Sequence, residues 1–140
     1  MIFQYMWQQV LDGTKTQTRR IVKPGEVLRF DPNPVYNAVH HMGGHAKWQT
    51  GNTYAVQPGR TQKAIARIEI TAIRQERVQD ISDEDVIAEG VVVWKWALWQ
   101  VESPFAAGYA ELWDSIHTSK GMRWSDNPLV WVIEFRLMQP

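Results

Sequence analysis

Three segments of the sequence carry the pattern of a short amphipathic helix. Before Gly13, a natural C-terminal cap, apolar side chains form one stripe: Met6, Trp7, Val10 and Leu11. After Ser103-Pro104, which is typical of a helix start, a longer stripe follows: Phe105, Tyr109, Leu112, Trp113 and Ile116. Between these stripes, Ser82 opens an acidic helix that ends at Gly90, with Glu89 in its last turn. The pattern therefore predicts three helices.

Alternating apolar and polar residues predict strands in the rest of the chain. The clearest alternation has Ala66, Ile68, Ile70 and Ala72 on one face, and the C-terminal one has Trp131, Ile133, Phe135 and Leu137. Further strands are expected on both sides of a Pro-Gly turn in residues 19–30, and in residues 52–57. Residues 31–52 read as a long loop with some local order around Trp48. Residues 91–101 are expected to form either a strand or a covering segment.

This order of elements predicts an α+β fold. Strands do not alternate regularly with helices, which argues against a doubly wound parallel sheet. The best fit is a small, mostly antiparallel β-barrel with about three flanking helices. The 140 residues are enough for one domain with a real core, so residues 1–140 are interpreted as a single domain.

The composition narrows the classes of function. Apolar residues make up 44% of the chain, and the 15 acidic and 15 basic residues give a formal net charge of zero. A protein that binds long nucleic acid by counterion release usually carries an excess of positive charge, which this chain lacks. A neutral net charge is compatible with a pocket that binds one nucleoside. Cysteine is absent, which excludes disulfides and thiolate chemistry. No signal peptide and no membrane-spanning run is found, so a cytoplasmic location is expected.

Residues 12–21, DGTKTQTRRI, place three threonine hydroxyls among three positive charges directly after the first predicted helix. By itself such a stretch is compatible with a solvated polar loop. In a straight strand, residues three apart point to opposite faces, so Lys15 and Thr18 can meet only if the chain bends between them. We therefore expect the segment from Thr14 to Gln17 not to be regular strand.

The same stretch resembles the signature Gly-x-Lys-x-x-Thr-x-Arg of the ASCH family, which has a PUA-like barrel. The matching residues are Gly13, Lys15, Thr18 and Arg20. Three later segments are similar to the family in the right order: YAVQPGR at 54–60, VQDISDEDVIAEGV at 78–91, and LWDSIH with RWSDNPLVWVIEF at 112–135. The resemblance covers nearly the whole chain and extends to phage-type members and to a branch that hydrolyses N4-acetylcytidine.

The resemblance implies a metal-independent amidohydrolase without a cofactor, acting on a small modified nucleoside. In that branch a Lys, a Thr three residues later and a Glu in the acidic helix carry the chemistry, which corresponds to Lys15, Thr18 and Glu89. Two mechanisms stay open. Neutral Lys15 could deprotonate Thr18 while Glu89 passes a proton to the exocyclic amine, or Glu89 could be the base while charged Lys15 stabilises the oxyanion. A Thr-Lys pair slightly favours the first mechanism.

Other side chains are candidates for substrate binding. Arg19 and Arg20 could hold a phosphate or a carbonyl. Four more residues could contact a base by hydrogen bonding or stacking: Tyr54, Gln57, Trp7 and Trp48. A histidine cluster, His40, His41 and His45, invites a zinc interpretation. It lies on a glycine-rich loop with no carboxylate close by, so no native metal site is expected.

Two alternative functions remain. The first is a non-catalytic RNA-binding module, which would need a basic face built from such residues as Arg19, Arg20, Arg60, Lys63 and Arg67. The second is RNA cleavage with the same lysine, threonine and glutamate. The expected partner is a small nucleoside, with RNA as the alternative and no membrane.

Overall fold

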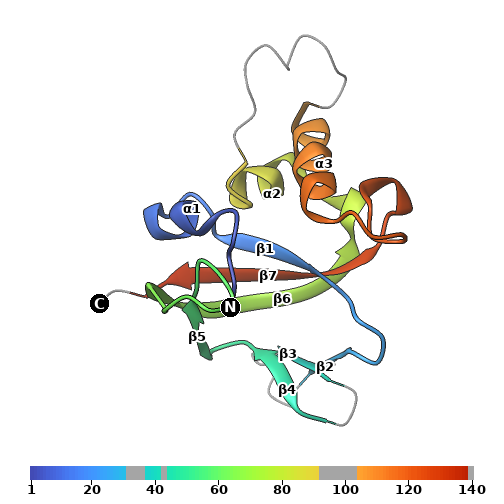
Figure 1. The fold of residues 1–140 in the computed structure, drawn as a ribbon. Coiled ribbons are helices and arrows are strands. Elements are labelled where there is room, and N and C mark those ends of the chain that lie inside the picture. The colour runs from blue at the N-terminus through green and yellow to red at the C-terminus, as the bar shows by residue number, and fades with distance from the viewer. Residues whose placement is uncertain (31–36, 42–43, 92–103, 139–140) are drawn as a thin grey trace.

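The computed structural model describes residues 1–30, 37–41, 44–91 and 104–138 (Figure 1). Its helices are α1 (Trp7–Asp12), α2 (Asp83–Ala88) and α3 (Pro104–Ile116), with 3-10 turns η1 (Val78–Asp80) and η3 (Trp124–Asp126). Its strands are β1 (Gln17–Ile21), β2 (Val27–Phe30), β3 (Asn37–His40), β4 (Ala46–Gln49), β5 (Thr53–Val56), β6 (Ala66–Arg77) and β7 (Leu129–Leu137).

The strands form two antiparallel sheets. One has the order β1-β7-β6-β5, and the other has the order β2-β3-β4. The predicted α+β class, with mostly antiparallel strands and three helices, is confirmed. Among the described residues the strands form two separate sheets, and no closed hydrogen-bonded barrel is seen.

A β-bulge in β6 interrupts the alternation that the sequence predicted for residues 66–72. The register with β7 shifts between Ile70 and Ala72, so the buried side chains are Ile68, Ile70 and then Ile73. The extra residue changes which face of the sheet the following side chains occupy. Ala72 is therefore only partly buried, and Arg74 and Glu76 lie on the side of the sheet that faces α2.

The expected loop at residues 31–52 was wrong at two places, because residues 37–40 form strand β3 and residues 46–49 form strand β4. Val39 and Trp48 are buried in a cluster with Ile70, Ile73 and Trp131 of the larger sheet. This burial stabilises two short strands that the local sequence specifies only weakly. Residues 31–36 and 42–43 lie outside the described residues.

Strand β7 is buried on both faces, although its sequence pattern predicted burial of one face only. Trp131 and Ile133 pack toward the smaller sheet, while Val130 and Val132 pack beneath α2 and α3. Figure 1 shows these two helices above the larger sheet and the smaller sheet below it. The larger sheet is therefore the middle layer, and its helix-covered face lies next to the cavity described below.

The helix ends agree with the sequence analysis. Gly13 closes α1 with φ of +84°, and Ser82 Oγ accepts from Asp85 N at 3.1 Å at the start of α2. Helix α3 starts at Pro104 as expected. Ser103 and the expected strand or covering segment, apart from Val91, lie outside the described residues. No helix in the described part of the chain is long and apolar enough to cross a membrane.

Candidate active site

The polar stretch after α1 bends before it becomes a strand. Thr14 Oγ1 donates to Asp12 Oδ1 at 2.6 Å, and Thr16 N donates to Ala88 O at 2.8 Å, which ties the bend to the end of α2. Residues 14–16 are outside regular strand, as expected, whereas Gln17 is already the first residue of β1. The consequence is that Lys15 and Thr18 line one cavity.

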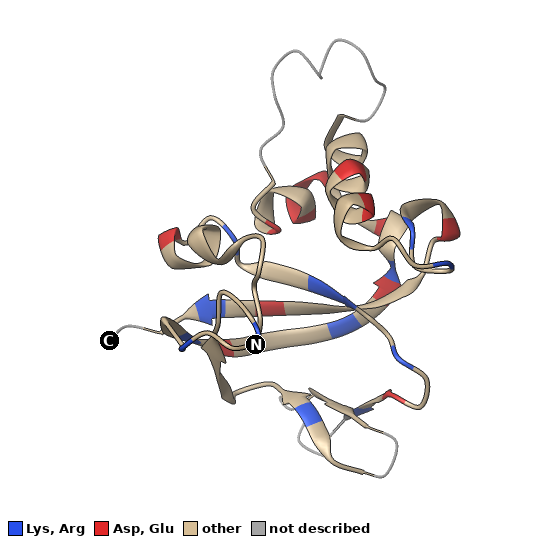
Figure 2. Ribbon diagram, viewed as in Figure 1, with Lys and Arg blue, Asp and Glu red and all other residues tan. Residues whose placement is uncertain are grey.

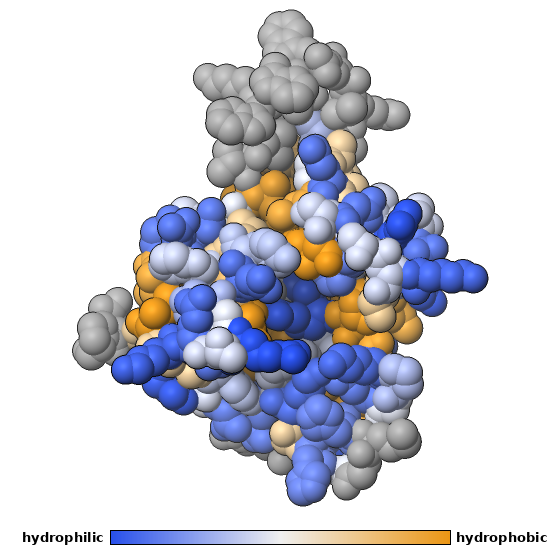
Figure 3. Space-filling view, viewed as in Figure 1, coloured by the Kyte–Doolittle hydropathy of each residue, from blue (hydrophilic) through white to orange (hydrophobic). Residues whose placement is uncertain are grey.

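That cavity has a volume of about 240 Å³ and lies between the N-terminal segment, β1, the end of α2 and one face of α3. Figure 3 shows a recess in this face of the molecule, with hydrophilic residues inside it and hydrophobic patches around it. The cavity is lined by Ile2, Phe3, Gln4, Tyr5, Met6, Lys15, Thr18, Arg19, Arg20, Glu89, Tyr109, Leu112, Trp113, Ile116 and His117.

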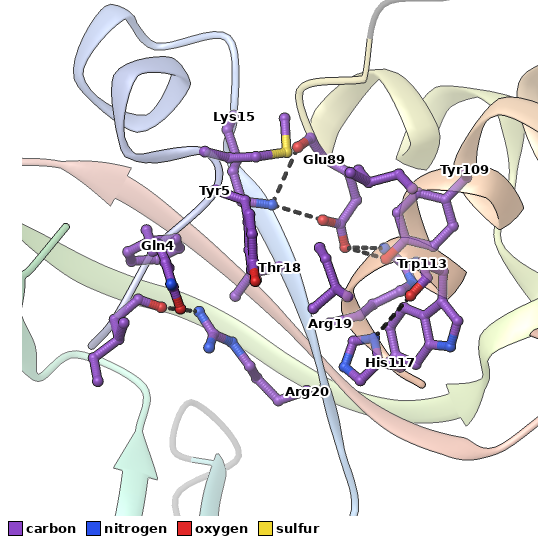
Figure 4. Close-up of a pocket in the computed structure, with 15 residues that line it drawn as sticks. Gln4, Tyr5, Lys15, Thr18, Arg19, Arg20, Glu89, Tyr109, Trp113 and His117 are labelled. Atoms are coloured by element: carbon purple, nitrogen blue, oxygen red, sulfur yellow. Dashed lines mark hydrogen bonds and ion pairs between the residues drawn. The ribbon is translucent and has the colours of Figure 1, made fainter. Parts of the chain in front are cut away.

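Lys15 is buried and fully hydrogen-bonded. Its Nζ donates to Glu89 Oε2 at 2.6 Å and to Glu89 O at 3.1 Å (Figure 4). The same nitrogen also donates to Gln17 O at 2.8 Å. Burial lowers the pKa of Lys15, and although Glu89 opposes this effect, the pKa stays below its usual value. The amine is therefore easier to deprotonate than an exposed lysine.

Glu89 is held at the C-terminal end of α2 with its side chain pointing into the protein, and only 4% of the residue is exposed. Oε1 accepts from Arg19 Nη1 at 3.1 Å and from the Tyr109 hydroxyl at 3.2 Å. Burial and the neighbouring carboxylate raise the pKa of Tyr109 well above its usual value, so the phenol stays protonated and donates. A carboxylate near the negative end of a helix dipole is mildly unfavourable, and these donors offset that effect at Glu89.

Arg19 is a structural cation within an ionic network. Its guanidinium also donates to Glu76 Oε1 at 2.7 Å and to Asp85 Oδ2 at 3.1 Å, while Arg74 Nη2 reaches the same Asp85 oxygen at 2.7 Å. Burial lowers the pKa of Arg19, but Glu89 and Glu76 outweigh this effect and the pKa is raised. Arg19 lines the cavity, yet its terminal nitrogens are engaged by carboxylates.

Arg20 is the more available of the two arginines. Its Nη2 donates to Ile2 O at 2.8 Å, and the guanidinium lies 5.2 Å from the centre of the Phe3 ring. Within the described residues, its Nε has no hydrogen-bond partner. Arg20 therefore lines the cavity with a guanidinium that no carboxylate of the described residues binds.

The structure does not bring the other four predicted base-contacting residues to this cavity. Trp48 and Tyr54 pack in the core between the two sheets, and the Tyr54 hydroxyl accepts from Gln49 N. Trp7 packs against a core cluster that contains Val10, Ile68 and Phe135, and it is not part of the cavity lining. Gln57 pairs with Phe3 through its backbone, and its side-chain amide donates to Gln62 O. These four residues pack in the core or hydrogen-bond to neighbouring strands and loops, so no substrate contact is proposed for them.

Several cavity residues were missed by the sequence analysis. Tyr109, Trp113 and His117 are spaced by four along α3 and its end, and therefore share one face. Trp113 and His117 stack with ring centres 3.8 Å apart, and burial lowers the pKa of His117. The polar ends of Tyr109 and His117 within an apolar stripe were the available indication. Tyr5 carried no such pattern.

The histidine cluster gives no support for a metal centre. His40 Nδ1 lies 3.0 Å from Gly44 O, on the smaller sheet away from the cavity. Within the ranges the structure describes, no group of three or more His, Cys, Asp or Glu side chains is arranged to hold a metal ion. The absence of a native metal site stays a prediction.

Gly90 fixes how closely α2 approaches Lys15. Its φ is +87°, and a Cβ there would lie 3.0 Å from Met6 Cε and 3.1 Å from Lys15 Cβ. We expect Gly90→Ala to destabilise the protein by about 2 kcal/mol, because a left-handed alanine costs about 1 kcal/mol and Lys15 must also shift. Gly121→Ala is a matched control, since its φ is +86° with nothing within 4 Å. Equal losses in denaturant unfolding would show that the contact with Lys15 is unimportant.

The fold is that of an ASCH domain, which is PUA-like, as two solved structures show. An ASCH domain from Lactobacillus crispatus JV V101 has a TM-score of 0.52 at 17% identity, covering 94% of this chain and 69% of that one. A protein of Enterococcus faecalis V583 described by the family model DUF984 has a TM-score of 0.56 at 14% identity, covering 95% and 66%. The chain thus spans about two thirds of the length of both.

The resemblance inferred from the sequence motifs is confirmed at the level of the fold. The sequence itself matches no protein-family model and has no significant match among curated proteins.

Proposed function

We propose that this chain is an amidohydrolase that removes the acyl group from N4-acylated cytosine nucleosides of the N4-acetylcytidine type, without a metal. The observation that carries the proposal is the convergence of Lys15 and Thr18, from the stretch after α1, with Glu89, from the end of α2, on one cavity of nucleobase size. A hydroxyl, an amine of lowered pKa and a carboxylate are the groups that amide hydrolysis through an acyl-enzyme requires.

The reaction begins with one proton shared by the Lys15–Glu89 pair. The pair is a buried salt bridge at rest, and movement of this proton from Nζ to Oε2 across the 2.6 Å contact gives the neutral Lys15 and protonated Glu89 that the reaction uses. Thr18 Oγ1 then attacks the acyl carbon, its proton passes to Lys15, and Glu89 protonates the departing exocyclic amine as the C–N bond breaks. An ester on Thr18 and a free cytosine compound result.

Water completes the cycle. Its oxygen adds to the ester carbonyl, its proton passes to Glu89, and Lys15 returns a proton to Thr18 Oγ1 as the carboxylic acid leaves. Lys15 is again neutral and Glu89 protonated, as at the start. Arg20, which lines the cavity and is not bound by a carboxylate of the described residues, is suited to hold the acyl oxygen or the carbonyl of the base. The mechanism with charged Lys15 and Glu89 as base is less favoured, because burial lowers the pKa of Lys15.

The size of the cavity supports a small substrate. Its 240 Å³ corresponds to about eight water molecules at roughly 30 Å³ each, and is below the roughly 300–1,000 Å³ of sites for drug-sized ligands. One base with a short acyl group suits this space. A polynucleotide could reach it only with a single base turned inward.

Tyr5 is the exposed aromatic residue of the lining, with 61% of the residue accessible. A ring at the rim of the cavity can stack on a base, which contributes about 1–3 kcal/mol. We therefore expect Tyr5→Ala to raise KM about tenfold with little change in kcat, and Tyr5→Phe to retain the wild-type KM. Steady-state kinetics provide the measurement, with Ile87→Ala, an exposed residue outside the lining, as the control. An unchanged KM in Tyr5→Ala would remove the stacking role.

The test of the proposal is incubation of the purified chain with N4-acetylcytidine, with cytidine and acetate measured by chromatography. Stoichiometric appearance of both products is expected, with multiple turnovers per protein molecule. N4-propionyl- and N4-benzoylcytidine are run in parallel, so that a preference for another acyl group is detected. No release from any of these compounds would contradict the proposal.

The RNA-binding alternative has less support. Arg19 is only 4% exposed and is bound by carboxylates, so it cannot contribute to an open basic face. Figure 2 shows acidic positions on α2 and α3 close to basic positions on β1 and β6. RNA binding in the absence of turnover, with affinity that falls steeply as salt rises, would favour the alternative.

A further inference from the structure

Glu89 divides its two carboxylate oxygens between different partners. Oε2 faces Lys15, whereas Oε1 receives hydrogen bonds from both Arg19 and Tyr109 (Figure 4). Arg19 lies on β1, one residue after Thr18, but Tyr109 comes from α3, a helix remote in sequence from the Lys-Thr motif. The Tyr109 hydroxyl is the contact through which α3 reaches the Lys15–Glu89 pair.

Tyr109 is fixed in place by its packing. The residue is 3% exposed, and its ring lies 6.1 Å from that of Trp113 and 6.2 Å from that of Trp124, edge-on to the latter. Its hydroxyl can only donate to the carboxylate, because burial keeps the phenol protonated. Arg19 is anchored independently by Glu76 and Asp85, so removal of the Tyr109 hydroxyl leaves that network in place.

We propose that Tyr109 is a positioning residue that stabilises negative charge on Glu89 and thereby sets the pH at which Lys15 loses its proton. A hydrogen bond donated to a carboxylate favours its ionised form and draws charge away from its other partners. Without this bond, more of the charge of Glu89 acts on the Lys15 ammonium, which then keeps its proton to higher pH. The expected effect of Tyr109 on the rate of hydrolysis rests on the proposed function, whereas its expected effect on the titration of Lys15 does not.

The other charged and titratable groups near Glu89 come from every surrounding element and stay the same when Tyr109 is changed. They are Lys15 before β1, Arg19 and Arg20 on β1, Arg74 and Glu76 on β6, Asp85 on α2, Glu134 on β7, and His117 after α3. A change in the titration of Lys15 in Tyr109→Phe can therefore be assigned to the hydroxyl.

The test is competitive acetylation of the full chain with trace acetic anhydride over a pH series, quantified at Lys15 by mass spectrometry. Tyr109→Phe is expected to move the midpoint of Lys15 acetylation upward by about one pH unit, which is tenfold in the proton equilibrium. The exposed Lys63 in the same samples is the internal control and keeps its midpoint. Tyr54→Phe removes a hydroxyl that accepts from Gln49 N in the smaller sheet, and it leaves the Lys15 curve unchanged.

A second variant at the same position keeps the inference testable if Tyr109→Phe does not fold. Site-specific 3-fluorotyrosine at position 109 keeps the ring and makes the hydroxyl a stronger donor, so the Lys15 midpoint moves downward. With N4-acetylcytidine as substrate, the acid limb of the pH profile of kcat/KM moves in the same direction as the midpoint in each variant.

Two outcomes separate this inference from the proposed function. Coincident Lys15 acetylation curves for the wild type and the position 109 variants overturn the role of Tyr109, even in an active enzyme. Absence of hydrolysis by the wild type overturns the proposed function, and shifted acetylation curves still support Tyr109 as the residue that sets the titration of Lys15.

Discussion

Thr18→Val is expected to lower kcat/KM for N4-acetylcytidine by at least about 10³-fold, because it removes the proposed nucleophile and nearly preserves the shape of the side chain. Thr18 is 5% exposed and lies in β1 with a partner, Ile133, on β7, so a β-branched replacement suits the strand. Thr18→Ser keeps a hydroxyl and is expected to retain measurable turnover. Both variants are measured under subsaturating substrate, with mass spectrometry to detect an acyl adduct on residue 18.

The control for this substitution is Thr71→Val, an exposed threonine on β6, where the same chemical change is expected to leave turnover within twofold. Activity of Thr18→Val within tenfold of the wild type would exclude Thr18 as the nucleophile. In that case a water activated by Glu89, with charged Lys15 stabilising the oxyanion, becomes the better description of the same site.

Arg19→Met is expected to destabilise the fold by about 3–5 kcal/mol, the largest effect on stability among the substitutions considered. The guanidinium side chain is 0% exposed and bridges Glu76, Asp85 and Glu89. Removal of one member of a buried ionic cluster leaves the opposite charges without their partner. For a typical slope of about 2 kcal/mol per M, the urea midpoint falls by about 2 M, measured by tryptophan fluorescence.

Arg136→Met is the matched control, because Arg136 also makes a bidentate contact with a carboxylate, that of Glu69. Its side chain is 65% exposed, so solvent screens the pair and a change below about 1 kcal/mol is expected. Comparable losses in the two variants would mean that the buried cluster does not anchor α2 to the sheet.

The helix boundaries and the bend after α1 could be predicted because both depend on short-range chemistry. Ser82 caps α2 and Gly13 closes α1 through contacts within a few residues, as the sequence indicated. The prediction that the chain bends between Lys15 and Thr18 followed from the period of a strand, and residues 14–16 are indeed outside regular strand. The convergence of Lys15 and Glu89, 74 residues apart, could be inferred only through the resemblance to a family.

The residues that line the cavity were predicted less well, because side-chain type does not reveal which cavity a residue faces. Trp48 and Tyr54 are suitable stacking residues by chemistry, but strands β4 and β5 direct them into the core between the sheets. Tyr5 lies in a turn without periodicity, and its place at the cavity rim depends on how the N-terminal segment crosses the larger sheet. Position relative to the cavity is a property of the packed fold.

The sequence by itself determined where the helices begin and end and the α+β class, and its resemblance to a known family indicated the three side chains proposed for the chemistry. Only the tertiary structure decided that β3 and β4 are strands, that β7 is buried on both faces, and that Tyr109 and Arg19 share one oxygen of Glu89. The physical reason is the distance along the chain over which each kind of interaction acts. Caps and periodicity act over a few residues, whereas burial and ion pairing join segments whose separation along the chain leaves no local trace.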